Sequence, residues 1–351
     1  MVSTSHNPPA IEVRNLVKRY PKARANAVDN VSFTVQRGEI FGLLGPNGAG
    51  KTTTIGILTT SVIPTSGASR IMDIDVSRDP IGVKQRISVV PQKSNLDLKL
   101  NAREILTFHA SYHGVPRAER NACADVLLAE FGLTERAKEK IGRYSGGMAQ
   151  RIMIARALMH TPEVLFLDEP TNNLDPQARL FLWERIRALQ ERGITILLTT
   201  HDMEEASRLC DRIAIMDHGH ILVCDTAAEL EKLIPGGTTL ELRVTVPQRT
   251  LVAAIGQGGA SISSPTATSE LQHVLGSLSG VTRVEEMHLP KEVEGQTDIS
   301  AFRLYAEDAS ALIARAVAVI TERDIELRDL HLARPSLEDV FIHLTGRNLR
   351  S

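Results

Sequence analysis

A glycine-rich segment near position 50 carries residue types suited to binding phosphate. It fits the pattern G-x-x-x-x-G-K-[ST] and consists of Gly45, Pro46, Asn47, Gly48, Ala49, Gly50, Lys51, Thr52 and Thr53. Glycines let backbone N–H groups close around a phosphate without Cβ clashes, and a following helix N-terminus adds partial positive charge. In such a loop Lys51 reaches the β- and γ-phosphates, and the Thr52 hydroxyl coordinates Mg²⁺. The pattern therefore predicts a nucleotide site.

The flanking residues favour this interpretation over two others. An apolar run at 39–44 predicts a strand before the loop, and residues 53–61 can continue as a helix after it. A glycine turn with a solvated lysine is the plain alternative. A dinucleotide-binding loop fits less well, because the glycine order differs and a lysine has no role there.

Further motifs follow the loop along the chain. They are VVPQ at 89–92, YSGGMAQR at 144–151, VLFLDEP at 164–170, NNLD at 172–175 and TTHD at 199–202. In this order they resemble the Q-loop, signature motif, Walker B motif, D-loop and switch histidine of ATP-binding cassette (ABC) ATPases. Tyr20 resembles the aromatic residue that stacks on adenine in that family. The resemblance covers about residues 10–230, and the ordered set is far more specific than any single motif.

The resemblance implies a role for each matched residue. The expected catalytic residues are Glu169 as general base, His201 as sensor of the γ-phosphate, Gln92 and Lys51. The expected Mg²⁺ ligands are Thr52, Gln92 and Asp168. The expected ATP-binding set adds Tyr20, Gly45 to Thr53, Ser145, Gly146, Gly147, Gln150 and Asp175. A helix N-cap pair is the plain alternative for Asp168 and Glu169.

The signature residues imply that two chains share each ATP. Ser145, Gly146 and Gly147 begin a predicted helix and so form a second anion site, although the chain already has a phosphate loop. In the family, two chains pair head to tail, so that the signature residues of one chain cover the ATP held by the phosphate loop of the other. This implies a homodimer that closes on ATP and opens after hydrolysis. Tyr144 and Asn173 depart from the family's usual leucine and small residue, but neither change removes a catalytic group.

Composition excludes several classes of protein. The chain has 351 residues and a formal net charge of -2, so no basic footprint indicates nucleic acid. Residues 1–10 lack the apolar core of a signal peptide, and no apolar run approaches the ~20 residues that span a bilayer. The membrane part of a transporter is therefore expected on another chain, with this chain peripheral on the cytoplasmic face of the cell membrane.

The cysteines and histidines indicate neither a disulfide nor a metal centre. The three cysteines are scattered, which suits small buried hydrophobes in a reducing cytosol. His218 and His220 flank a glycine between two apolar runs, which predicts a hairpin turn rather than a metal pair. His109 and His113 are four apart on an expected helix, but no third ligand accompanies them, so they are expected to be structural or exposed.

Patterning in the first two thirds predicts an α/β fold. Nearly continuous apolar runs at 164–167 and 195–200 predict strands of a parallel sheet buried on both faces. The resemblance to ABC ATPases implies that this is the P-loop NTPase fold, with a RecA-like mixed sheet. Runs at 11–17 and 31–35 predict an antiparallel lip that presents an aromatic residue to the base. Residues of about 93–160 show only helical signals, at 101–114, 118–130 and 147–160, and predict a helical subdomain within a nucleotide-binding domain at 1–235.

Residues 236–351 are predicted to form a small C-terminal α+β accessory domain. Its predicted strands lie at 239–246, 281–287, 299–305 and 325–332, its helices at 270–278 and 308–323, and a last helix is capped at 336 and ends at 345. The order β-α-β-β-α-β is ferredoxin-like. The segment RPSLEDVF at 334–341 resembles the tail of exporter ATPases in the drug-resistance and nodulation-factor branch, with a generic dimer-stabilising helix as the alternative.

The leading hypothesis is the ATPase subunit of a membrane exporter of the multidrug-resistance type, working as a homodimer under separate ABC-type permease subunits. An importer ATPase would differ only in its partner. A soluble ABC ATPase acting on DNA or ribosomes is less favoured, because the chain has neither a long coiled coil nor a second cassette. A regulatory protein that uses ATP only as a switch is disfavoured by Glu169 and His201. The sequence does not name the substrate, whose pocket lies in the membrane partner.

Overall fold

The computed structural model describes two compact units that divide between Ala227 and Ala228. The described residues are 8–234, 238–245, 267–287, 299–306, 309–323, 325–333 and 335–346. Each unit has sheets and helices of its own. None of the helices in these ranges has the length and apolar character to cross a membrane.

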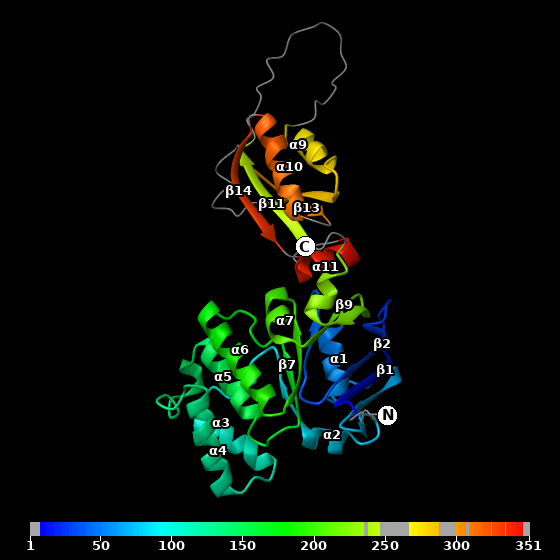
Figure 1. Cartoon of the computed structure of the whole chain (residues 1–351). Helices are drawn as coiled ribbons and strands as arrows, with labels where there is room; N and C mark the ends of the chain where they lie inside the picture. Colours follow the sequence, from blue (N-terminus) through cyan, green and yellow to red (C-terminus); the bar gives the residue numbers. More distant parts are fainter. Residues whose placement is uncertain are drawn as a thin grey trace, which may run out of the picture. The chain divides into compact units, whose positions relative to one another are not determined.

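A six-stranded mixed sheet forms the centre of the first unit (Figure 1). Its order is β10-β9-β3-β8-β7-β6. The bounds are β3 Ile40–Leu44, β6 Ile87–Val90, β7 Val164–Asp168, β8 Thr195–Thr200, β9 Arg212–Asp217 and β10 His220–Asp225. All neighbours pair in parallel except β9 and β10, which form the predicted hairpin. Every residue of β3, β7 and β8 is buried, as expected for strands covered on both faces.

Three helices start just beyond the carboxyl ends of central strands. They are α1 (Lys51–Leu58) after β3, α6 (Pro176–Glu191) after β7 and α7 (Met203–Leu209) after β8. Asp175 caps α6 and Asp202 caps α7, each accepting a hydrogen bond from a backbone N–H in the first turn. Parallel strands place the loops that follow them at one edge of the sheet, and ligands of such folds bind at that edge.

A four-stranded antiparallel sheet forms the predicted lip. Its order is β2-β1-β4-β5, with bounds β1 Ile11–Lys18, β2 Val28–Val35, β4 Ser66–Ile71 and β5 Ile74–Asp75. Helix α2 (Pro80–Arg86) follows it. Phe33 of β2 stacks on Phe41 of β3, with ring centroids 5.2 Å apart. The lip and the central sheet therefore share one hydrophobic core.

A helical insert connects β6 to β7, as the sequence predicts. It comprises α3 (Ala102–Tyr112), α4 (Arg117–Glu130), the 3-10 turn η1 (Ile141–Arg143) and α5 (Gly146–Ala157). The predicted capping box is present, because the Asn101 side chain accepts from the Glu104 N–H and the Glu104 carboxylate accepts from the Asn101 N–H. Helix α5 ends at Ala157 rather than at the predicted His160, which lies in the loop beyond it.

The second unit contains a four-stranded antiparallel sheet of order β12-β13-β11-β14. Its elements are β11 Thr238–Thr245, α9 Ala267–Gly276, β12 Val281–Met287, β13 Ile299–Ala306, α10 Ala309–Glu322, β14 Glu326–Ala333 and α11 Leu337–Thr345. The short α8 (Ala227–Glu231) lies at the division between the units. Leucines of α9 and α10 share a buried core with β11 and β13, so both helices cover one face of the sheet (Figure 1). A capping box at Ser336 and Asp339 starts α11, as predicted.

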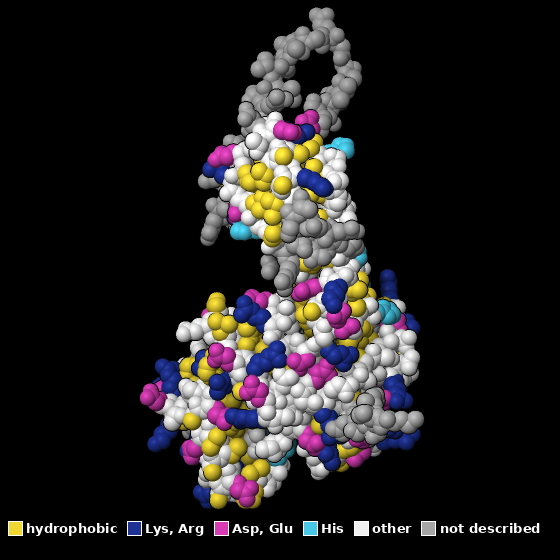
Figure 2. Space-filling view, in the orientation of Figure 1, with side chains coloured by type: hydrophobic (Ala, Val, Ile, Leu, Met, Phe, Trp, Pro, Cys, Tyr) yellow, Lys and Arg dark blue, Asp and Glu magenta, His cyan; other side chains and the backbone are white. Residues whose placement is uncertain are grey.

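Acidic and basic side chains are interspersed on the face of each unit that Figure 2 shows. This mixture agrees with the small formal net charge of -2 for the whole chain.

Candidate functional site

The glycine-rich loop lies between β3 and α1 and holds a buried lysine. The Lys51 ammonium donates to the carbonyl groups of Gly45 at 2.7 Å and Pro46 at 3.1 Å. It also lies 3.7 Å from a carboxylate oxygen of Glu169. Burial lowers the pKa of Lys51, whereas Glu169 and Asp168 act in the opposite direction. A desolvated cation held in a loop at a helix N-terminus is suited to an anionic phosphate.

Two glycines of this loop have no room for a side chain. A Cβ on Gly45 would lie 2.1 Å from the Met216 carbonyl oxygen, and a Cβ on Gly50 would lie 2.4 Å from the Ala27 carbonyl oxygen. Gly50 also has a φ of 107°, a left-handed conformation that favours glycine. The loop therefore keeps its shape only with glycine at these two positions, packed against β9 and against the residue before β2.

Asp168 ends strand β7 beside the hydroxyl of Thr52. One oxygen of the Asp168 carboxylate accepts a hydrogen bond from Thr199 Oγ1 at 2.6 Å and another from Thr52 Oγ1 at 3.3 Å. Carboxylate and hydroxyl oxygens are the hard ligands that Mg²⁺ prefers in nucleotide sites. The carboxylate and hydroxyl oxygens at this position therefore fit Mg²⁺, the predicted ion.

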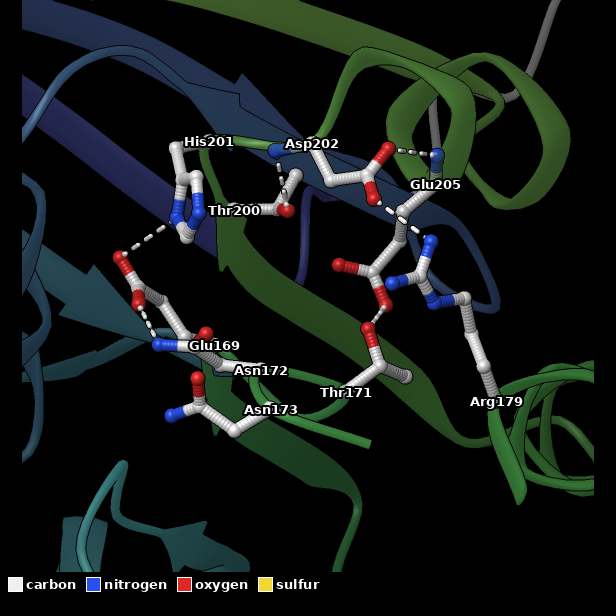
Figure 3. A pocket seen from close by; sticks show the side chains of 9 residues that line it. All are labelled: Glu169, Thr171, Asn172, Asn173, Arg179, Thr200, His201, Asp202 and Glu205. Carbon is white, nitrogen blue, oxygen red and sulfur yellow. Dashed lines mark hydrogen bonds and ion pairs between the residues drawn. The ribbon is translucent and has the colours of Figure 1, made fainter. Parts of the chain in front are cut away.

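Four side chains converge on the carboxylate of Glu169. Its Oε1 lies 3.7 Å from Lys51 Nζ and 3.4 Å from His201 Nδ1. Its Oε2 accepts hydrogen bonds from Gln92 Nε2 at 2.7 Å and from Asn172 Nδ2 at 2.9 Å. Figure 3 shows the carboxylate between the His201 ring and the Asn172 amide. The structure thus brings together the four residues predicted to be catalytic, which come from four separate segments.

The backbone of Glu169 is strained and held in place by Thr199. Glu169 has a φ of 47°, which costs a non-glycine residue of the order of 1–3 kcal/mol and is often found at functional sites. Its N–H lies 3.1 Å from both the carbonyl oxygen and the hydroxyl oxygen of Thr199. Because the same hydroxyl donates to Asp168, Thr199 orients both acidic residues. Thr199 belongs to the TTHD motif at 199–202, but the motif alone predicted no role for it.

Tyr20 lies beside the end of the glycine-rich loop. Its hydroxyl oxygen is 3.5 Å from Thr53 Oγ1, and the residue is 41% exposed. The Lys18 ammonium stands 5.1 Å from the ring centroid. An exposed aromatic ring next to a phosphate loop is suited to stacking on a base.

The signature residues lie at the start of α5 and are not joined to the glycine-rich loop. Ser145 Oγ accepts a hydrogen bond from the Met148 N–H at 3.3 Å. A Cβ on Gly146 would meet no atom within 4 Å, so packing within this chain does not require glycine there. Across the described ranges, no hydrogen bond or ion pair links Ser145, Gly146 or Gly147 to residues 45–53. Gln150 is buried on α5, and Asp175 remains engaged as the cap of α6.

A second buried acid lies behind the site and was not predicted. Glu205 of α7 accepts hydrogen bonds from Thr171 Oγ1 at 2.6 Å and from Trp183 Nε1 at 3.1 Å. Burial raises the pKa of Glu205. Thr171 and Glu205 line the same small pocket as Glu169 and His201 (Figure 3). No sequence pattern predicts this network, because its members come from the loop after β7, from α6 and from α7 and match no motif.

The expectation that no third ligand accompanies His109 and His113 is wrong, although His113 is exposed. His109 and His113 do have a possible third ligand, because His160 lies beside them, and nitrogen atoms of the three rings lie within 4.8 Å of one another. The sequence placed His160 at the end of a different helix, 47 positions beyond His113 by the printed numbering. Folding of α5 against α3 brings the rings together, which spacing alone does not reveal.

Comparison with known proteins identifies the family of the chain. Residues 28–172 match a family model described as ABC transporter. The chain is 38% identical to the linearmycin resistance ATP-binding protein LnrL of Bacillus subtilis over 97% of this chain and 99% of that protein. The chain belongs to the ABC transporter ATPases. This ABC ATPase is also 38% identical to the Nod factor export ATP-binding protein I of Burkholderia lata, over 97% of this chain and 98% of that protein.

A solved structure supports the same conclusion. The ABC ATPase is similar to a dimeric ATP-binding cassette in a post-hydrolysis state bound to ADP and phosphate, with a TM-score of 0.57 and 27% identity. The match covers 62% of this chain and 98% of that chain. The predicted resemblance to the drug-resistance and nodulation-factor branch, the P-loop fold of the first unit and ATP binding by this family are therefore confirmed.

Proposed function

We propose that this ABC ATPase drives a membrane exporter through separate permease subunits, at the cytoplasmic face of the cell membrane. The relatives named for linearmycin resistance and for Nod factor export are similar over 97% of the chain, a span that includes the second unit. A similarity confined to the nucleotide-binding unit would fit an ATPase of any transporter. Similarity that continues through the second unit favours this exporter branch over the importer and over soluble ABC proteins.

The hydrolytic role rests on the convergence of four side chains on Glu169. Gln92 and Asn172 both donate to Oε2, which orients the carboxylate and leaves Oε1 to accept a proton from the attacking water. Lys51 and His201 face that same Oε1, so they lie where the charge of a γ-phosphate would be stabilised. Glu169 is accordingly assigned as the general base, with Lys51 and His201 as the groups that contact the γ-phosphate.

The remaining residues of the site are assigned to binding. Tyr20 stacks on adenine, and the backbone of Gly45 to Thr53 surrounds the phosphates. Thr52 and Asp168 would hold Mg²⁺, together with the amide oxygen of Gln92, whose amide nitrogen donates to Glu169. The ion supplies charge neutralisation on the phosphate oxygens when it is bound.

The site is completed by a second copy of the chain. The N-terminus of α5 carries Ser145, Gly146 and Gly147 and has no bond to the glycine-rich loop of its own chain. Gly146 has open space around it, which would admit the phosphates of an ATP held by a partner. The similar dimeric cassette supports this arrangement. Gln150 and Asp175 are assigned to the same shared interface.

The chain is proposed to consist of a nucleotide-binding domain at 1–235, with its helical subdomain at about 93–160, and an accessory domain at 236–351. The accessory domain is proposed to be ferredoxin-like. Support comes from its strand order β12-β13-β11-β14 and from two helices that cover one face of an antiparallel sheet.

Capture from membranes tests the exporter assignment. The full chain, carrying a removable affinity tag, is expressed in its native host, and membranes are solubilised in mild detergent before capture. We expect a polytopic membrane protein to be recovered in comparable amount and to change the ATPase rate when both are reconstituted into vesicles. The soluble fraction is captured in parallel as a control. Recovery of ribosomes or DNA-bound proteins from that fraction, with no membrane subunit, would contradict the assignment.

A further inference from the structure

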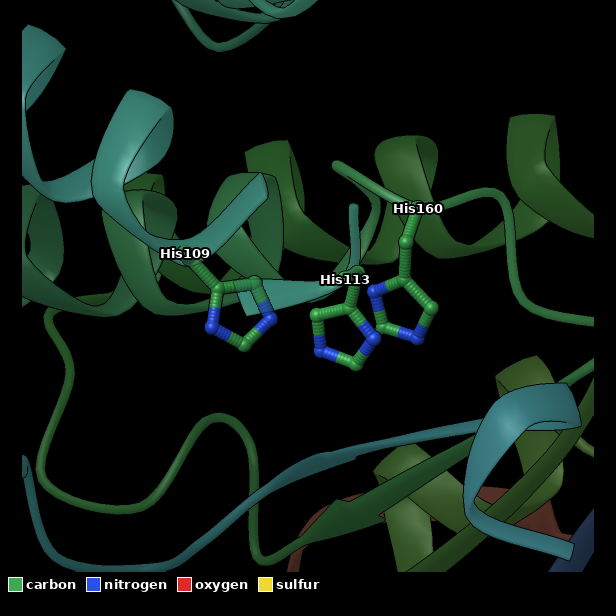
Figure 4. A group of neighbouring side chains, drawn as sticks. All are labelled: His109, His113 and His160. Carbon is green, nitrogen blue, oxygen red and sulfur yellow. The ribbon is translucent and has the colours of Figure 1, made fainter. Parts of the chain in front are cut away.

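Three histidine rings meet where the helical insert contacts the central sheet. His109 lies on the last turn of α3, His113 is the residue that caps the end of that helix, and His160 follows α5 (Figure 4). The His113 and His160 rings are stacked with centroids 3.7 Å apart, and the His109 centroid lies 4.9 Å from that of His113. Nothing in the nucleotide site uses these residues.

The hydrogen bonds of His160 fix which of its ring nitrogens carries the proton. Nε2 lies 3.1 Å from the Ile87 carbonyl oxygen and 3.2 Å from Ser88 Oγ. The Ser88 hydroxyl donates its own hydrogen to the Ala157 carbonyl, so both neighbours of Nε2 are acceptors. Nε2 therefore carries the hydrogen, and Nδ1 has a free lone pair.

That lone pair is buried and has no partner. His160 Nδ1 is enclosed within the protein and makes no hydrogen bond. A buried polar atom without a partner is unfavourable and calls for an explanation, such as an ion. The arrangement also matches the usual surroundings of a metal-binding histidine, in which the second nitrogen donates to a backbone carbonyl and orients the ring.

We propose that His109, His113 and His160 form a binding site for a divalent transition-metal ion of the Zn²⁺ class. Three imidazoles with a fourth position open to water are a known ligand set for Zn²⁺. His113 is exposed, so water has access to this side of the cluster and would be available as a fourth ligand. The site joins α3 to the loop after α5 and to β6, which leads into Gln92.

Two features of the cluster affect how an ion would bind: the distances between the ring nitrogens and the charge of Arg156. Tetrahedral Zn²⁺ needs nitrogens about 3.3 Å apart, whereas the three rings offer atoms within 4.8 Å. The exposed His113 ring must therefore turn out of its stack on His160. Arg156 lies close enough to His109 for its positive charge to act on that ring. The charge of Arg156 opposes a cation and limits the affinity.

Metal titration of the full chain tests the site. The affinity tag is removed, bound metal is stripped with a chelator, and Zn²⁺ is titrated by calorimetry, with Co²⁺ absorption as a second readout. We expect one ion per chain and the intense visible bands of tetrahedral Co²⁺. His113→Ala should weaken Zn²⁺ binding at least about 100-fold, since even outer partners of a metal ligand contribute 10- to 100-fold.

His220→Ala is the matched control, because His220 is exposed and lies on the β9–β10 hairpin. It should bind Zn²⁺ like the unmodified chain. His160→Ala should reproduce the loss, but His113→Ala decides the outcome if the buried substitution prevents folding. Equal binding by His113→Ala and the unmodified chain, or no stoichiometric binding at all, would overturn the proposal. Loss of binding in His220→Ala would move the site to the hairpin and overturn it as well.

Discussion

Glu169→Gln is expected to bind ATP normally and to hydrolyse it about 10²- to 10⁴-fold more slowly. Glutamine keeps the shape of the side chain and one oxygen, but it cannot take a proton from the attacking water. The loss corresponds to roughly 2.7–5.5 kcal/mol in the activation barrier. Turnover is measured as phosphate release at saturating ATP, and binding is measured by equilibrium titration. The ATP-bound dimer should then accumulate on gel filtration.

Glu163→Gln provides the control for this variant. Glu163 precedes the same strand at its other end and pairs with Arg86 on the surface, so its loss should leave turnover unchanged. Wild-type turnover in Glu169→Gln, or a monomer at saturating ATP, would show that Glu169 is not the general base.

Lys51→Ala is expected to slow ATP turnover strongly and to weaken ATP binding. Lys51 is the buried cation of the glycine-rich loop and is already oriented by two backbone carbonyls. Loss of one preorganised group that stabilises transition-state charge costs about 10²–10³-fold in rate. The effect is measured as kcat/KM for ATP, and circular dichroism checks that the variant folds.

An exposed lysine on the neighbouring helix α2 serves as the comparison. Lys84→Ala removes the same charge outside the site and should retain the rate of the unmodified protein. Near-native ATPase activity in Lys51→Ala would mean that the loop does not contact the phosphates.

Residue patterns predicted the parts of the fold that depend on residues close together in the sequence. The fully buried strands β7 and β8 correspond to continuous apolar runs, and the capping box at Asn101 marks the start of α3. The glycine-rich loop was predicted from its G-x-x-x-x-G-K-[ST] pattern, and the structure adds that a Cβ on Gly45 or Gly50 would clash with a backbone oxygen. These features need only a few neighbouring residues, so the sequence alone shows them.

The family resemblance predicted that the four catalytic residues meet, but other contacts between distant segments were not predicted. Thr199 contacts both Asp168 and Glu169 because β7 and β8 are adjacent in the sheet. Glu205 gains its partners Thr171 and Trp183 only when α6 and α7 pack together. His160 joins His109 in the same way, after α5 folds against α3. Each case requires the register or the packing of elements, which no single motif encodes.

The central claim is that ATP is bound between two copies of the chain, and mixing two defective variants tests it. Lys51→Ala is placed in one copy and Ser145→Arg in the other, both in a Glu169→Gln background that stops turnover. A mixed dimer then places both defects in one site and leaves its second site with an intact Lys51 and an intact Ser145. A dimer made of two copies of the same variant has one defect in each of its two sites.

Trapping of labelled ATP on gel filtration is the measurement that decides the claim, with differently tagged copies showing that mixed dimers form. The shared-site account predicts almost no trapping by either variant alone. It predicts recovery on mixing of up to about a quarter of the trapping by Glu169→Gln alone, because random pairing makes half of the dimers mixed. If the site lay within one chain, both partners would remain defective. Mixed dimers that form but trap no ATP would contradict the account.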